Sequence, residues 1–102
     1  MDVQALRSSV TQDAPPPGLG HALAALWWDA KGDWDKAHAE AQKDPGPQGC
    51  AVHAYLHRVE GDLSNAGYWY NRAGRRPVSD PLPVEWDALA RELLAQKGGV
   101  GR

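Results

Sequence analysis

Two histidines and a glutamate, His53, His57 and Glu60, follow one another at intervals of four and three residues. On an α-helix these spacings place the three side chains on one face. Imidazole nitrogens and carboxylate oxygens are both metal ligands and proton carriers. The sequence therefore indicates this stripe as the place where chemistry could occur, although it identifies no reaction.

A divalent metal ion is one hypothesis for this stripe. Histidines at positions i and i+4 can hold one ion, and Glu60 would complete a set of two histidines and one carboxylate. The zinc-protease motif is excluded, because Ala54 stands where that motif needs its general-base glutamate. A related hypothesis is acid–base catalysis, in which His57 is the base and Glu60 orients it.

A pocket for a small polar ligand is a second hypothesis, and it includes the residues that follow the stripe. Aromatic walls with a few convergent polar groups are typical of ligand sites. A third hypothesis is purely structural: both histidines bond to neighbouring polar groups and only hold two helices together. The candidate ligand-binding residues are His53, His57, Glu60, Asn65, Tyr68 and Trp69.

Composition narrows the class of protein. The 102 residues suffice for one domain, and a net charge of -2 argues against nucleic-acid binding, which needs a basic face. One cysteine, Cys50, excludes an internal disulfide and fits a reducing compartment. The chain shows neither a signal-peptide pattern nor an apolar stretch of membrane-spanning length. We therefore expect a cytoplasmic protein with no nucleic-acid or membrane partner.

Apolar residues recur at spacings of three and four through most of the chain, which predicts helices and no strand. Segments 1–17 and 98–102 lack this pattern, so we expect a flexible N-terminal tail, a single all-α domain at 18–97 and a flexible C-terminal tail. Glycine, proline and aspartate mark the ends of five helices. Their expected ranges are about 19–32, 34–43, 49–60, 63–73 and 84–97.

The first four helices form an internal repeat. Placing Gly32-Asp33 on Gly61-Asp62, an offset of 29 residues, aligns small residues in both halves, Ala25 with Ala54 and Ala37 with Ala66. Each half is then a helical hairpin that is closed by a Gly-Asp turn and packed through a small alanine.

The second hairpin is the specialised copy. Four aligned positions differ in character, and three of the four exchanges add a hydrogen-bonding or metal-ligating group where the first hairpin has an apolar side chain or a lysine. The exchanges are Ala24 to His53, Trp28 to His57, Lys31 to Glu60 and Lys36 to Asn65. A binding site is therefore expected on the second hairpin.

The Gly-Asp turn with an alanine four residues after its aspartate and aromatic residues on both sides resembles the tetratricopeptide repeat (TPR), over about residues 22–77. The 29-residue offset is shorter than the 34 residues typical of that family. The resemblance implies a helical scaffold with a concave face, capped by the last helix, and it implies no enzyme. The string from His53 to Tyr70 also resembles a small bacterial and fungal family, which has no known activity to transfer.

These observations predict an interaction or ligand-binding module whose partner is a protein or a small polar ligand. No cofactor is expected, apart from the divalent metal ion of the first hypothesis. Five tryptophans suit half-buried positions and interfaces, which favours a homodimer through exposed aromatic surface. Three arginines close the fourth helix, where they complement the helix dipole or contact an anion or an acidic partner. These are Arg72, Arg75 and Arg76.

Overall fold

The computed structural model describes the backbone of residues 1–99 and the side chains of residues 1–96, and within these residues the chain is all-α. The prediction of an all-α domain is thus confirmed, and helices α2 to α6 correspond to the five expected ranges. None of the helices in this part of the chain combines the length and apolar character of a membrane span. The helices are α1 (Val3–Ser8), α2 (His21–Lys31), α3 (Trp34–Gln42), α4 (Pro47–Val59), α5 (Leu63–Ala73) and α6 (Leu82–Gly99), and a 3-10 turn, η1 (Ser9–Thr11), follows α1.

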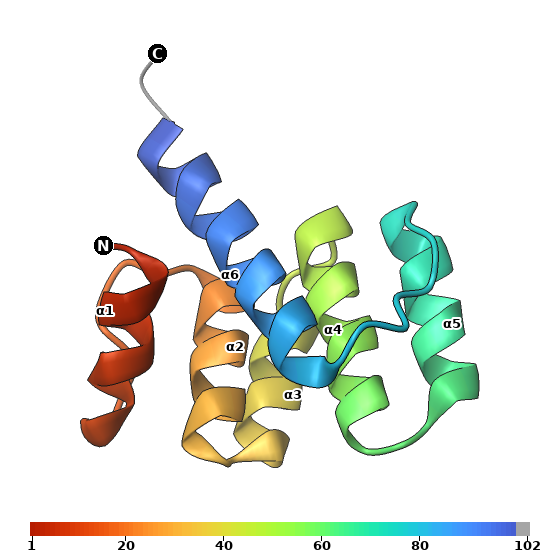
Figure 1. Cartoon of the computed structure of the whole chain (residues 1–102), viewed down its shortest axis with the longest axis horizontal. Coiled ribbons are helices and arrows are strands. Elements are labelled where there is room, and N and C mark those ends of the chain that lie inside the picture. Colours follow the sequence, from red (N-terminus) through yellow and green to blue (C-terminus); the bar gives the residue numbers. More distant parts are fainter. Residues whose placement is uncertain (100–102) are drawn as a thin grey trace.

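Two adjacent helix pairs, α2 with α3 and α4 with α5, form the centre of the fold (Figure 1). The Gly-Asp turns join the helices of each pair in the same way. Gly32 and Gly61 have φ angles of 92° and 86°, a conformation that residues with a side chain rarely adopt. The aspartates that follow then cap α3 and α5 by accepting a backbone N–H three residues on.

Small side chains lie at equivalent places in the two pairs. Ala25 and Ala37 in the first pair, and Ala54 and Ala66 in the second, are all buried. A methyl group at these positions lets the paired helices approach closely without leaving a cavity. The two pairs therefore share their turns, their aspartate caps and their buried alanines.

Helix α6 crosses α2 and α4 and covers one face of both pairs (Figure 1). The buried Trp86 of α6 donates its indole N–H to the Leu26 carbonyl of α2 at 2.9 Å. Helix α6 therefore packs on α2 and α4.

Helix α1 packs against α2 and α6, which corrects the expectation of a flexible tail at 1–17. Val3 and Leu6 are buried, and the Trp27 indole N–H donates to the Ser9 hydroxyl at 2.9 Å. Helix α1 has only six residues, too few for a periodic pattern to be recognised in the sequence. At the other end Gly98 and Gly99 continue α6 instead of starting a tail, and residues 100–102 lie outside the described residues.

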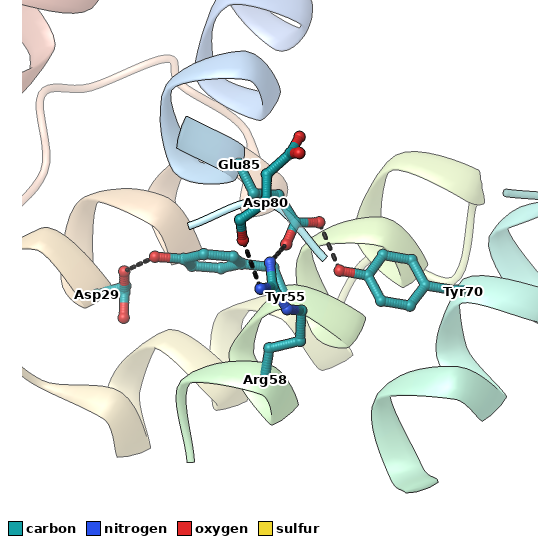
Figure 2. A network of polar contacts seen from close by, with 6 residues as sticks. All are labelled: Asp29, Tyr55, Arg58, Tyr70, Asp80 and Glu85. Carbon is teal, nitrogen blue, oxygen red and sulfur yellow. Dashed lines mark hydrogen bonds and ion pairs between the residues drawn. The ribbon is translucent and has the colours of Figure 1, made fainter. Parts of the chain in front are cut away.

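A buried polar network holds α4, α5 and the start of α6 together (Figure 2). The carboxylate of Glu85 accepts hydrogen bonds from Arg58 Nη1 and from the Tyr70 hydroxyl, both at 2.6 Å. Arg58 Nη2 donates to the Asp80 carbonyl, also at 2.6 Å. Burial and the bond to Glu85 raise the pKa of Tyr70, so its hydroxyl remains a donor. Arg58 directly follows His57, so this network fixes the helix that carries the candidate site.

A second polar contact joins α4 to α2. The Tyr55 hydroxyl donates to Asp29 Oδ2 at 2.9 Å (Figure 2). Burial raises the pKa of Asp29 above its ordinary value, although this hydrogen bond acts in the opposite direction. The two contacts hold α4 from both sides.

Candidate functional site

Three histidines meet between α3 and α4. His53 and His57 are only 4% and 5% exposed, and His38 of α3 joins them from across the helix interface. The ring centroid of His38 lies 4.5 Å from that of His53 and 5.3 Å from that of His57. One nitrogen of each ring lies within 4.8 Å of the others. We call these three residues the histidine cluster.

A close approach between α4 and the preceding loop sets the position of the cluster. A Cβ atom on Gly49 would lie 1.9 Å from the Asp44 carbonyl oxygen, so only glycine fits there. The loop that leaves α3 is thereby pressed against the first turn of α4. Since His38 lies on α3 and His53 lies one turn beyond Gly49, this approach brings the two rings together.

Two tryptophans hold the imidazole rings in place. The Trp69 ring of α5 stacks on His53 at 3.8 Å between centroids and 12° between planes. The Trp34 ring stacks on His38 at 4.8 Å and 12°, and its indole N–H donates to the Leu56 carbonyl at 2.8 Å. The rings are therefore restricted in orientation by neighbours from α3, α4 and α5.

Glu60 orients His57 and does not join the cluster as a further donor. Its Oε1 lies 2.6 Å from His57 Nδ1, the geometry expected of an orienting carboxylate. A carboxylate only accepts, so Nδ1 carries the hydrogen, and in the neutral imidazole the lone pair is then on Nε2. The described residues contain two groups with metal-ligand geometry: the histidine cluster, and His57 with Glu60 and Asp62. The predicted set of His53, His57 and Glu60 is not one of them.

His53 makes no hydrogen bond within the described residues, so the hypothesis of a closed network fits His57 but not His53. Burial, followed by the neighbouring His38 and His57, lowers the pKa of His53 to about 4. Burial and His57 also lower the pKa of His38, although Glu60 and Asp35 act in the opposite direction. Both rings are therefore neutral near pH 7, with a free lone pair each.

A cavity of about 190 Å³ opens beside His53. Its wall combines aromatic surface from Trp69, the cation of Arg72 and the thiol of the buried Cys50. The lining residues come from α3, α4, α5 and the loop between α3 and α4. They are Ala41, Gln42, Asp44, Pro45, Cys50, His53, Trp69 and Arg72.

The candidates from the start of α5 separate in the structure. Trp69 lies on His53 and lines the cavity, as a ligand-site residue would. Asn65 is exposed, and its backbone N–H donates to the Asp62 side chain at 3.1 Å. Tyr68 is 53% exposed, and its ring meets Trp69 edge-on at 5.2 Å. Asn65 and Tyr68 therefore lie outside the cavity wall.

The three arginines also have different environments. The Arg72 guanidinium lies 5.3 Å above the Trp69 ring and lines the cavity. Arg75 forms an ion pair with Glu92 of α6. Arg76 is exposed and forms no ion pair or hydrogen bond within the described residues. Only Arg72 is placed to contact a ligand of this cavity.

His38 was not predicted as a site residue. In the repeat alignment His38 falls on Gly67, so the comparison of the two halves gave no signal. The spacing from Trp34 to His38 could have provided one, because residues four apart share a helix face. That signal shows only that the two rings are neighbours. The approach of His38 to His53 depends on how α3 packs on α4.

Lowering the pH is expected to destabilise the protein through His53. The unfolded-state pKa of histidine is about 6.5, and the folded state lowers the pKa of His53 to about 4. The stabilisation is therefore complete above pH 6.5 and is lost as the pH falls towards 4. Between pH 7.5 and 4.5 the wild type should lose on the order of 2 kcal/mol more than His53→Gln. Urea unfolding in EDTA at both pH values measures this difference.

Comparing the wild type with His53→Gln at each pH separates the effect of His53 from that of the carboxylates, because the carboxylates titrate in both proteins. His21→Gln, at an exposed histidine of α2, is the histidine control, and its expected difference from the wild type comes from Glu40, whose pKa is lowered by Lys43 and then by His21. A stability difference between wild type and His53→Gln that stays constant with pH would contradict the prediction.

Comparison of the chain with protein-family models, with curated proteins and with solved structures finds no match. The geometry of the site is therefore the basis for the functional proposal.

Proposed function

We propose that this chain is a ligand-binding module built on two TPR-like helical hairpins, and that its ligand is a small carboxylate. The observation that carries the proposal is the state of His53. This side chain is more than nine-tenths buried, makes no hydrogen bond within the described residues and lies at a cavity that also holds an arginine. No side-chain nitrogen of the described residues is both sealed from solvent and without a partner, so the His53 nitrogens are open to the cavity and a ligand there would bond to them.

The arrangement of the helices supports the scaffold part of the proposal. Both pairs share the Gly-Asp turn, the aspartate cap and a buried alanine in the second helix, as a repeated hairpin would. Helix α6 covers α2 and α4 in the manner of a capping helix. The side of α3 and α5 is left for recognition, and the cavity opens there.

The size and charge of the cavity indicate the class of ligand. About 190 Å³ is smaller than the roughly 300–1,000 Å³ of sites for drug-sized molecules, so a ligand of a few heavy atoms fits. Arg72 is the positively charged residue that lines the cavity, and guanidinium groups bind carboxylates with two parallel hydrogen bonds. Asp44 is the anion of the wall, but its Oδ1 accepts the Gly46 N–H at 2.9 Å. Trp69 provides apolar surface for the rest of the ligand.

Substitution of Arg72 tests the proposal. Benzoate should bind the wild type and quench its tryptophan fluorescence, whereas the neutral isostere benzamide should bind at least tenfold more weakly. Arg72→Gln should weaken benzoate binding by about 10- to 100-fold, because a charge-assisted hydrogen bond is lost. Isothermal titration calorimetry gives the dissociation constants.

Arg76→Gln is the matched control, because Arg76 is an exposed arginine four residues further on. Its benzoate affinity should equal that of the wild type. Equal affinities for benzoate and benzamide, or equal losses in the two arginine variants, would refute the carboxylate site.

A protein partner is the alternative ligand class, and a homodimer is one form of it. Tyr68 of α5 is the one exposed tryptophan or tyrosine among the described residues, and Leu63, also on α5, is 70% exposed. These exposed apolar side chains favour a protein contact at α5. The other aromatic side chains of the described residues are buried or half-buried, so the homodimer predicted from aromatic surface would have to rest on Tyr68.

A further inference from the structure

The histidine cluster has a property that a carboxylate site does not require. Its three imidazoles come from two helices and converge, with one nitrogen of each within 4.8 Å of the others. Imidazoles that only fill a core are free to turn their nitrogens towards separate hydrogen-bond partners. Here neither His38 nor His53 has such a partner among the described residues, so the nitrogens face one another without a bond between them.

The chemical state of the rings suits a metal ion. Metal binding needs a neutral imidazole, since a proton competes for the lone pair. His57 presents Nε2 because Glu60 holds the hydrogen of Nδ1 at 2.6 Å. A carboxylate behind a histidine is the usual arrangement around metal sites, where it fixes the ring and raises its basicity. His38 and His53 each place one ring nitrogen within 4.8 Å of the others and supply the other two ligand atoms.

An ion can reach these nitrogens. Every side-chain nitrogen or oxygen that is sealed from solvent in the described part of the chain has a hydrogen-bond partner. Because the His53 ring has none, its nitrogens must retain some contact with solvent. The cavity at His53 provides the path. Two buried donors and the half-buried His38, with access for an ion, satisfy a condition for metal loading.

The geometry points to one divalent transition-metal ion, with zinc as the best match, bound by His38, His53 and His57. Three imidazoles suit zinc and its neighbours in the first transition row, whereas Mg²⁺ and Ca²⁺ take oxygen ligands. Three protein ligands also leave a fourth position of a tetrahedral ion for water or another small ligand. Glu60 is then a positioning residue and not a ligand.

The competing donor group fits less well. An ion bound by His57, Glu60 and Asp62 would draw the Glu60 carboxylate away from His57 Nδ1. It would also draw the Asp62 carboxylate away from the Asn65 N–H that it caps. Both carboxylates are also exposed, so an ion there would compete with water for them. Substitution of His38 separates the two groups, because only the histidine cluster contains it.

Zinc titration of the untagged, EDTA-treated and dialysed protein tests the inference. We expect one Zn²⁺ per chain by calorimetry and by elemental analysis after gel filtration, and a raised melting temperature with Zn²⁺. His38→Gln and His57→Gln should each weaken binding at least 100-fold while the circular-dichroism spectrum stays helical. Glu60→Gln should weaken it by about 10- to 100-fold, as loss of a group behind a ligand does.

His21→Gln is the matched control, because His21 is exposed, bonded to Glu40 at 3.0 Å and outside the cluster. It should bind Zn²⁺ as the wild type does. Less than one Zn²⁺ per wild-type chain, or wild-type affinity in folded His38→Gln, would overturn the inference. The wild-type titration needs no variant, so misfolding of a variant cannot hide the answer.

The metal site and the carboxylate site can fail separately. Arg72→Gln should retain full zinc affinity, since Arg72 is not a donor in the cluster. Benzoate binding is measured in EDTA, without any metal ion. A protein that binds zinc but not benzoate refutes the carboxylate proposal alone, and the reverse result overturns the metal site alone.

Discussion

Glu85→Ala is expected to lower the free energy of unfolding by about 3–5 kcal/mol, the range observed when one partner of a buried ion pair is removed. Glu85 is 4% exposed and accepts hydrogen bonds from Arg58 and Tyr70. Its loss leaves the Arg58 guanidinium, whose side chain is 12% exposed, with only the Asp80 carbonyl as a partner. The buried Tyr70 hydroxyl also loses its acceptor. Urea unfolding followed by far-ultraviolet circular dichroism measures the change.

Glu92→Ala is the matched control for this prediction. It breaks the ion pair between Arg75 and Glu92, whose side chains are each about one-third exposed. Pairs so accessible to water contribute about 0–1 kcal/mol, so this variant should remain close to the wild type. If Glu85→Ala cost no more than Glu92→Ala, the network would not be the connection that holds α5 and α6 on α4.

The network also bears on the site. Tyr70 follows Trp69 on α5, and Arg58 follows His57 on α4. Loss of the bond between Tyr70 and Glu85 therefore loosens the two helices next to the stack of Trp69 on His53. In Glu85→Ala we expect weaker zinc and benzoate binding even though Glu85 touches neither ligand.

Leu6→Ala is expected to lower the free energy of unfolding by about 2–5 kcal/mol. The Leu6 side chain is fully buried, in the core that α1 shares with α2 and α6. Truncation removes apolar contacts and leaves a cavity, because the fixed helices on either side cannot close the gap. The same urea titration measures the effect.

Leu63→Ala is the control, because it makes the same chemical change at a side chain that is 70% exposed. Exposed substitutions usually stay within about 0.5 kcal/mol of the wild type. Equal stabilities of the two leucine variants would mean that α1 contributes nothing to the core, and the expectation of a tail at residues 1–17 would then hold in solution.

Local rules explain why so much of the helical structure could be predicted. Helix α5 was expected at 63–73 and spans the same residues, because Asp62 caps its first turn and Gly74 ends it with a φ of 73°. The equivalent turn at Gly32 follows the same chemistry. Each of these signals involves residues within one or two turns of one another, so the sequence displays them directly. Helix α1 was missed because its two buried residues, Val3 and Leu6, are recognisable only once α2 and α6 lie beside them.

The candidate site was predicted in part. Contacts within one helix could be predicted, and contacts between helices could not. His53, His57 and Glu60 were found because their spacing places them on one helix, and the bond between His57 and Glu60 lies within that helix. Glu60 was predicted both as a ligand and as the orienting partner of His57, and its bond to His57 matches the second of these roles. The membership of His38 and the different environments of Arg72 and Arg75 were not predicted, because both depend on which helices pack together.

The sequence by itself thus determined the all-α class, the helix ends and one face of α4 that carries two histidines. Only the tertiary structure decided that His38 completes the cluster, that Arg72 faces the cavity beside it and that α6 covers the opposite side. The physical reason is that helix capping and apolar spacing are properties of neighbouring residues. The approach of α3 to α4, by contrast, is set by side-chain packing across the whole domain, including the close contact of Gly49 with Asp44.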